Sequence, residues 1–247
     1  MDLLSGHIGS HLRELRQRLI VSFAAIIVCG SVSYYFSEPI ARFFMVPLFS
    51  AHPALTGLVY TNLTEAFVTY IKVALLVGVI CSFPVLIYQS WMFVAPGLHG
   101  AEKWLVGKVV FWGTGLFLGG VAFSFFAVLP RMLHFLMSFA GPDLVPMPKL
   151  DGYLTFVARL ALSFGLAFEI PFLMVAAGKA GLVSRSYFVK KRKYAYLGIL
   201  GISFLLTVGD PFATIFLTVP LICLYEAGVL VMRIFLRDSE EVLPEKS

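Results

Sequence analysis

Long apolar stretches separated by short polar ones dominate the pattern along this chain of 247 residues. A helix needs about 20 apolar residues to cross a bilayer core of roughly 30 Å. The stretches are apolar nearly all round and lack the alternation of membrane β-strands, which favours helices. We therefore predict an all-α membrane protein with six transmembrane helices, over residues 19–35, 66–93, 104–129, 153–177, 194–208 and 212–235.

The last two apolar stretches are short. The fifth rises only about 22 Å at 1.5 Å per residue, and the sixth meets Glu226 after a similar distance. We predict two short final helices and a locally thinned bilayer beside them. Pro84, Pro171 and Pro220 fall inside spans and are expected to kink them, and bent helices can line a concave surface.

The distribution of basic residues predicts the orientation. Six spans place both termini on one side, and the other side has only Arg42, Arg131 and Lys149 outside the spans. Lys and Arg favour the cytoplasmic side, so both termini are expected to be cytoplasmic. The basic residues on the terminus side are Arg13, Arg16, Arg18, Lys103, Lys108, Lys179, Arg185, Lys190, Lys191, Arg192, Lys193, Arg233, Arg237 and Lys246.

Three regions follow from this pattern. Leucine and isoleucine recur at helical spacing at Ile8, Leu12, Leu15 and Leu19, so residues 1–18 are expected to form a cytoplasmic amphipathic segment at the membrane interface. This segment lacks the features of a cleavable signal peptide, so we expect it to be retained. Residues 19–236 form the membrane domain, and 237–247 a charged cytoplasmic tail. The proline-rich outer loops 36–65 and 130–152 are expected to be ordered caps.

Two acidic residues fall near the cytoplasmic ends of spans. Glu14 precedes Arg18 by four residues, the spacing of a favourable surface ion pair. Pro96 and Gly97 break the chain, and Glu102 then begins the next helix, where a carboxylate suits the helix dipole. From spacing alone, both are explained by these local roles.

Polar residues at membrane depth deserve a different interpretation. Glu169 lies deep in the fourth span, two residues before Pro171, and a carboxyl group there is costly and indicates function by default. The alternative is a protonated carboxyl group bonded within the bundle. Asp210 before Pro211 is an ordinary helix start, and Lys72 lies near the outer face, where it can snorkel. Gly115 and Gly119 form a GxxxG pattern, which permits close helix packing.

Composition and motifs exclude most enzyme classes. The chain is 59% hydrophobic and 13% charged, unlike a soluble domain. It has no phosphate-binding GxxxxGK[ST] loop, no HExxH and no GxSxG. Its three cysteines lie in apolar stretches without metal-ligand spacing. We therefore expect no catalytic residues, metal or cofactor. The net charge of +5 reflects basic residues on the cytoplasmic side, so it does not indicate a nucleic-acid partner.

Four short stretches together resemble the TatC family, whose members are core subunits of twin-arginine protein translocases. They are residues 11–19 (HLRELRQRL), 93–98 (FVAPGL) with Glu102, 168–171 (FEIP) and 209–211 (GDP). The resemblance covers nearly the whole chain. It implies a concave, glove-like wall of six helices in the bacterial inner membrane. It also implies transport powered by the proton-motive force, in a complex with TatA- and TatB-type single-span partners that contains a homo-oligomer of this chain.

The resemblance also implies roles for individual residues. Glu14 and Glu102 match the carboxylates that recognise the arginine pair of a signal peptide, and Phe93 matches the aromatic residue beside them. Arg16 and Pro47 match positions linked to activity.

Further residues match positions in or near the membrane. Glu169 matches the carboxylate of the groove, Asp210 an acid of the outer turn, and Pro96 and Pro171 structural prolines. Thr214 stands where some members have a glutamine that contacts a partner helix, and its shorter side chain puts that contact in question.

Other functions also fit part of the pattern. A proton-coupled secondary transporter of a small solute would use Glu169 as proton carrier, but no two corresponding halves are found in the sequence. A scaffold for single-span subunits would bind partners without affinity for signal peptides. An intramembrane protease would need a nucleophile and base, which the spans lack.

Overall fold

The computed structural model describes residues 2–53, 55, 57–94, 103–139, 146–179, 181, 183–207 and 211–235. Within them the fold is helical, with one isolated bridge between Val59 and Lys149. The elements in chain order are α1 (Asp2–Tyr35), α2 (Ser37–Ala51), α3 (Glu65–Val94), α4 (Lys103–Phe123), the π-helix η2 (Ser124–Val128), α5 (Leu129–Met137), α6 (Leu150–Lys179), α7 (Arg185–Lys190), α8 (Arg192–Leu206) and α9 (Pro211–Phe235).

Five helical stretches of the described chain are long and apolar enough to cross a membrane. They correspond to the predicted first, second, third, fourth and sixth spans, and the all-helical prediction is confirmed. Helix α8 coincides with the predicted fifth span but has only 15 residues, so a sixth crossing stays a prediction. The five stretches are Leu12–Tyr35, Glu65–Phe93, Val106–Met137, Leu150–Lys179 and Thr214–Ile234.

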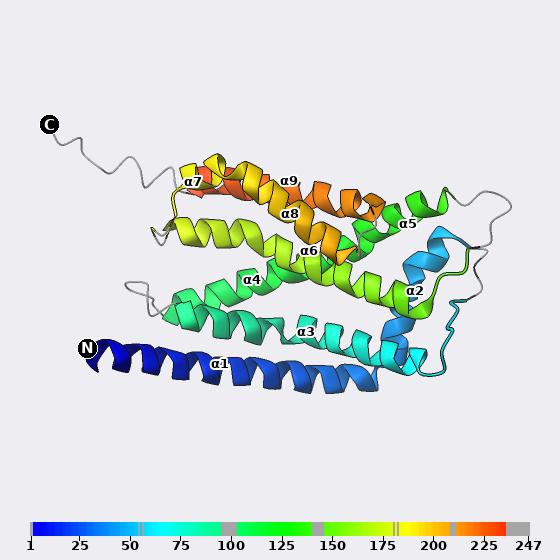
Figure 1. Ribbon diagram of the computed structural model, residues 1–247, viewed down its shortest axis with the longest axis horizontal. Coiled ribbons are helices and arrows are strands. Elements are labelled where there is room, and N and C mark those ends of the chain that lie inside the picture. Colours follow the sequence, from blue (N-terminus) through cyan, green and yellow to red (C-terminus); the bar gives the residue numbers. More distant parts are fainter. Residues whose placement is uncertain are drawn as a thin grey trace.

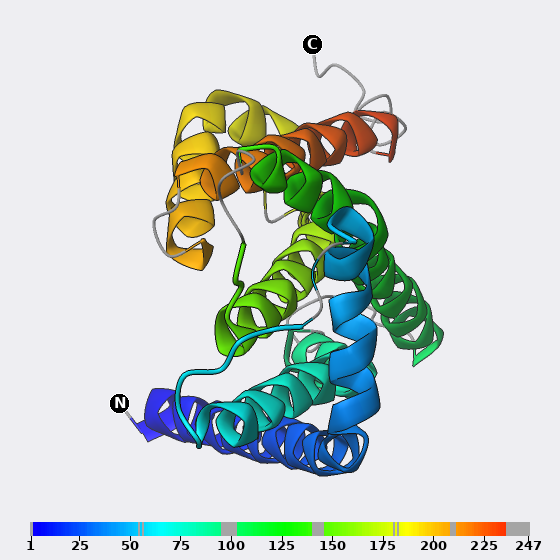
Figure 2. The same ribbon diagram turned by 90° about the vertical axis from the view of Figure 1, so that its right-hand side faces the viewer.

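The helices form a curved wall (Figures 1 and 2). Helices α1 and α3 run side by side at one edge, α8 and α9 lie at the other, and α4 and α6 lie between them. Helix α2 stands across one end of the wall. We call the end that holds the N-terminus the near end, on the left in Figure 1, and the opposite one the far end.

The first helix contains both the predicted amphipathic segment and the first predicted span, and the interfacial position of that segment stays a prediction. Helix α1 runs without interruption from Asp2 to Tyr35, so the amphipathic turns continue directly into the apolar ones. The physical reason is the absence of proline from this stretch, because an uninterrupted backbone hydrogen-bond ladder favours one straight helix.

Helices occupy part of both predicted outer loops, which were expected to be ordered caps. Residues 37–51 form α2 although Pro39 and Pro47 lie in it. Pro39 is in the first turn, where a backbone N–H has no helical partner anyway. The third span continues through η2 into α5, and the Leu129 N–H bonds to the Ser124 carbonyl five residues back. This wider turn lies just before Pro130, which lacks the N–H that an α-helical turn requires.

The prediction of two short final helices is half wrong. Helix α8 is short, but α9 has 25 residues. Glu226 does not end α9, because its carboxylate accepts hydrogen bonds from Arg192, at 2.7 Å, and from the Tyr196 hydroxyl of α8. Burying an isolated charge is costly, but a carboxylate with hydrogen-bond partners costs less. The apolar helix can therefore continue past Glu226.

Glycines lie at close helix contacts, though not those of the GxxxG pattern. A Cβ built on Gly78 of α3 would lie 2.6 Å from the Gly30 Cα of α1, and one on Gly120 would lie 2.5 Å from the Phe164 carbonyl oxygen. Gly115 and Gly119 have nothing within 4 Å of a built Cβ. The GxxxG pattern thus makes no close helix contact within the described part of the chain, whereas Gly78 and Gly120 lie where α1 meets α3 and α4 meets α6.

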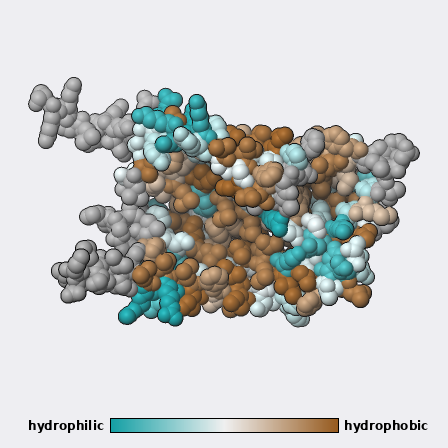
Figure 3. Space-filling view, viewed as in Figure 1, coloured by the Kyte–Doolittle hydropathy of each residue, from teal (hydrophilic) through white to brown (hydrophobic). Residues whose placement is uncertain are grey.

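The surface shown in Figure 3 is mainly hydrophobic in its middle. Hydrophilic side chains gather toward the two ends of the molecule, at the near end and over the far ends of α3 and α6. An apolar girdle between polar ends is the arrangement expected for a protein that spans a bilayer.

Candidate functional site

Three polar groups at the near end join α1 to α3. Arg18 of α1 donates to the Glu14 carboxylate and, through Nη1, to the Gln89 Oε1 of α3 at 3.3 Å. The Arg18 side chain is 18% exposed, whereas that of Glu14 is 36% exposed. Arg18 is thus held between two acceptors, and the Glu14 carboxylate faces solvent more than its partner does.

The other residues expected near Glu14 are placed only in part. Arg16 is exposed on α1, and Phe93 is half-buried near the C-terminal end of α3. Glu102 and Pro96 lie outside the described residues. The local pairing of Glu14 with Arg18 that spacing predicts is present, and the third member, Gln89, was not predicted because it is 71 positions away in the chain.

A hollow of about 960 Å³ lies between α3 and α4, toward the near end. Tyr88 and Met92 line it from α3, and Val110, Phe111 and Thr114 line it from α4. The Thr114 hydroxyl is buried without a hydrogen-bond partner in the described chain. The hollow is mostly apolar and lies toward the end of α3 that carries Phe93. Hydrophobicity along the sequence cannot reveal this hollow, because its residues come from two helices.

Glu169 is enclosed within the wall. It is 5% exposed on α6, and neither carboxyl oxygen has a hydrogen-bond partner among the described residues. Gly113 of α4 faces it, since a Cβ built there would lie 3.4 Å from Oε2. Pro171 follows inside the same unbroken helix. The carboxyl group thus occupies a desolvated position between α4 and α6.

Hydroxyl groups line the contact of α8 with α9 toward the far end. Thr214 is 6% exposed, and its hydroxyl lies 2.7 Å from that of Thr207. Thr218 donates to the Thr214 carbonyl, while the buried Ser203 hydroxyl lacks a partner in the described chain. Thr214, predicted as a partner contact, is therefore turned toward α8. Asp210 falls outside the described residues.

A long-range hydrogen bond joins helix α2 to the wall. The Tyr153 hydroxyl of α6 donates to the Phe44 carbonyl at 2.8 Å, and Pro47 and Leu48 are buried beside this contact on α2. Pro47 thus fills a packed position. No group of three or more His, Cys, Asp or Glu side chains suited to a metal ion occurs in the described part of the chain.

Comparison with known proteins gives one consistent family. The family model "Sec-independent protein translocase protein (TatC)" matches residues 10–220. Proteins named Sec-independent protein translocase protein TatC are 39% identical in Desulforapulum autotrophicum, over 94% of this chain and 86% of the relative, and 34% identical in Escherichia coli K12, over 94% and 91%. A solved structure described as "Crystal Structure of Twin Arginine Translocase Receptor- TatC" superposes with a TM-score of 0.86 at 31% identity, covering 92% of this chain and 100% of that one.

Proposed function

Because this chain belongs to the TatC family of Sec-independent protein translocase proteins, we propose that it is the signal-peptide receptor and core subunit of a twin-arginine translocase. The relatives are named as translocase components and the solved neighbour as a receptor. This family favours protein export over the proton-coupled transporter of a small solute.

The observation that carries the receptor proposal is the shared Arg18 guanidinium. Arg18 bonds to both Glu14 and Gln89, so Glu14 can turn to an incoming arginine while Arg18 keeps one acceptor. A carboxylate grips the planar guanidinium with two hydrogen bonds, whereas lysine offers a point charge. Glu14 therefore supplies one carboxylate for the arginine pair, and Glu102 supplies the second, with Phe93 beside them.

The basic surroundings sharpen this selectivity. Arg16 and its neighbours make the near end positive, so a positively charged signal peptide finds few other acidic docking points. Arg16 also repels cations that lack a carboxylate partner. The apolar part of the signal peptide then continues along the wall from the near end.

The proposed topology has six crossings, with the near end in the cytoplasm of a bacterial cell and the chain in its inner membrane. The excess of Lys and Arg in the near-end segments supports this orientation. Helix α8 crosses at the edge of the wall, where a short helix is accommodated by local thinning of the bilayer.

TatA- and TatB-type single-span proteins are the proposed partners, in a complex that holds several copies of this chain. The hydroxyl row along α8 and α9, with Thr214, offers hydrogen bonds to a partner helix if the Thr207–Thr214 bond opens. Glu169 and Asp210 are the other groups proposed to serve partner contact. Glu169 is enclosed between α4 and α6, so its contact with a partner requires these helices to separate, and its desolvated carboxyl group then gains from a polar group on the incoming helix.

The test is equilibrium binding of a twin-arginine signal peptide to the detergent-solubilised protein. We expect Glu14→Gln to weaken binding about tenfold, the loss of one charge-assisted pair of about 1.4 kcal/mol. A peptide with Lys-Lys should bind the unaltered protein as weakly. Glu38→Gln is the matched control, because Glu38 pairs with Arg42 at the same spacing on α2, at 2.6 Å. Equal affinities of the Glu14 and Glu38 variants would refute the assignment.

A further inference from the structure

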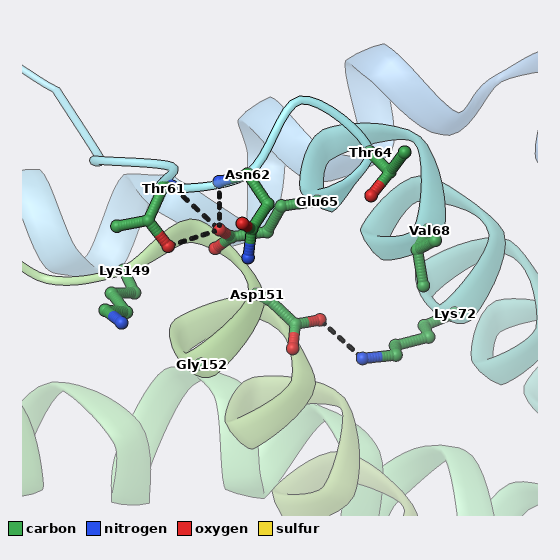
Figure 4. Close-up of a pocket in the computed structure, with 9 residues that line it drawn as sticks. All are labelled: Thr61, Asn62, Thr64, Glu65, Val68, Lys72, Lys149, Asp151 and Gly152. Carbon is green, nitrogen blue, oxygen red and sulfur yellow. Dashed lines mark hydrogen bonds and ion pairs between the residues drawn. The ribbon is translucent and has the colours of Figure 1, made fainter.

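A polar pocket of about 440 Å³ lies at the far end, between the first turns of α3 and α6 (Figure 4). It is lined by Thr61 and Asn62 of the preceding segment, Glu65 and Lys72 of α3, and Lys149 and Asp151 at the start of α6. This volume is in the lower part of the range of small-molecule sites. The pocket shares no residue with the sites described above.

The floor of the pocket is an ordered ion pair. Lys72 Nζ donates to Asp151 Oδ1 at 2.7 Å, and the hydroxyls of Thr69 and Thr155 donate to the same oxygen at 3.1 and 3.2 Å. All three donors use Oδ1, so Oδ2 has no hydrogen bond in the described chain. Lys72 and Asp151 are 43% and 35% exposed, which leaves both groups accessible from the pocket.

A second carboxylate is held in the same way. Glu65 Oε2 accepts from the Thr61 backbone N–H at 2.8 Å, the Thr61 hydroxyl at 3.2 Å and the Asn62 backbone N–H at 3.3 Å. The Asp151 backbone N–H adds a further favourable interaction with the Glu65 carboxylate. Both acids of the pocket are therefore held in place as carboxylates that a ligand cation can approach.

Lys149 supplies an ammonium group with no hydrogen bond or ion pair to a described residue. It is exposed, and in Figure 4 it lies on one side of the pocket, with Asp151 between it and Lys72. Two lysines and two carboxylates make the pocket neutral overall but locally charged. Such a pocket complements a ligand that carries both signs, whereas a simple anion would meet two carboxylates.

The pocket lies where a bilayer surface is expected. Two membrane-crossing stretches begin beside it, at Glu65 and Leu150. Leu63 and Phe67, which neighbour the pocket residues in the chain, are 96% and 58% exposed and could contact the apolar part of a lipid at such a surface. Val68 adds an apolar wall to the pocket, so a ligand with a charged head and an apolar body would satisfy both surfaces.

From these observations we propose that the pocket binds the headgroup of a membrane phospholipid that carries a phosphate and a primary ammonium. The phosphate lies against Lys149, whose ammonium group makes no ion pair with a described residue, and the ammonium of the headgroup donates to the carboxylates of Glu65 and Asp151. A quaternary ammonium has no N–H to donate, so a choline headgroup binds less well. The proposal rests on the placement of the α3 and α6 ends at a membrane surface and is independent of signal-peptide recognition.

The test is retention of lipid by the detergent-purified protein, measured by native mass spectrometry. Phosphatidylethanolamine, phosphatidylcholine and phosphatidylglycerol with identical acyl chains are supplied in equal amounts. We expect phosphatidylethanolamine to be retained preferentially and Lys149→Gln to reduce its retention about fivefold, as for the loss of one partly exposed charge pair. Lys149→Arg should restore it. Lys193→Gln, which removes an exposed lysine at the near end, should change nothing.

Equal retention of the three lipids, or unchanged retention in Lys149→Gln, would overturn the proposal. Soluble phosphoethanolamine and inorganic phosphate distinguish the source of the ligand. Stable retention of either one without a lipid preference would indicate a site for free phosphate compounds and overturn the lipid assignment. Signal-peptide binding of the same variants should be unchanged, so failure here is separable from failure of the receptor proposal.

Discussion

The contact of Gly78 with Gly30 leads to a sharp prediction about the seam between α1 and α3. In Gly78→Ala the new methyl group would lie 2.6 and 2.7 Å from the Gly30 Cα and N atoms and 3.2 Å from the Ile26 carbonyl oxygen. All three are backbone atoms, so no side-chain rotation relieves the clash and α1 must move away from α3.

The expected cost follows from two opposing effects. Overpacking of this kind destabilises the folded protein by about 1–3 kcal/mol, and replacing glycine by alanine within a helix stabilises it by about 0.5–1 kcal/mol. We expect a net destabilisation of about 1–2 kcal/mol. For a chain of this size this corresponds to a decrease in Tm of about 2–8 °C. Signal-peptide binding should weaken too, because Arg18 and Gln89 bridge the same seam.

Two alanine variants provide controls for this seam. In Gly30→Ala the atoms nearest to the new Cβ would belong to Leu75 and Ala74, at 3.5–3.9 Å, which is ordinary contact, and in Gly115→Ala it would meet nothing within 4 Å. Both should keep or slightly raise the Tm of the detergent-solubilised protein, followed by intrinsic fluorescence. If Gly78→Ala and Gly115→Ala have the same Tm, the inferred packing of α1 on α3 is wrong.

Two further predictions concern α2 and α8. Tyr153→Phe removes the donor to the Phe44 carbonyl and should destabilise the protein by about 1 kcal/mol. Tyr194→Phe is the control, because Tyr194 is exposed on α8. An equal Tm for the two variants would contradict a stabilising role for the Tyr153 hydrogen bond. The bilayer should be thinner beside α8, whose 15 residues rise only about 22 Å; scattering or simulation that gives a uniform thickness around the protein would refute this.

The helices were largely predictable because their apolar length is a local property. Five of the predicted spans coincide with long helices of the structure. The errors came from residues that have two local meanings. Pro39 and Pro47 predicted an ordered outer loop without indicating that it is the helix α2, and Glu226 was interpreted as lying near the end of a short membrane helix. Neighbours distant in sequence decide between these meanings.

The candidate site was predictable only where its contacts are local. Glu14 and Arg18 are four residues apart, so helical spacing predicts their pairing. Gln89 joins them from 71 residues away, and Lys72 meets Asp151 across 79 residues. Nothing in the hydrophobic pattern specifies which polar residues of separate spans lie at the same height and on facing sides.

The sequence by itself determined that this is a helical membrane protein of the TatC family, because apolar length, charge bias and short motifs are properties of the chain alone. Only the tertiary structure decided that Gly78 rather than the GxxxG pattern lies at a close helix contact, that Glu169 is enclosed between α4 and α6, and that four charged groups surround one pocket at the far end. These features depend on the rotation and offset of each helix against its neighbours, which side-chain packing sets and one-dimensional periodicity leaves open.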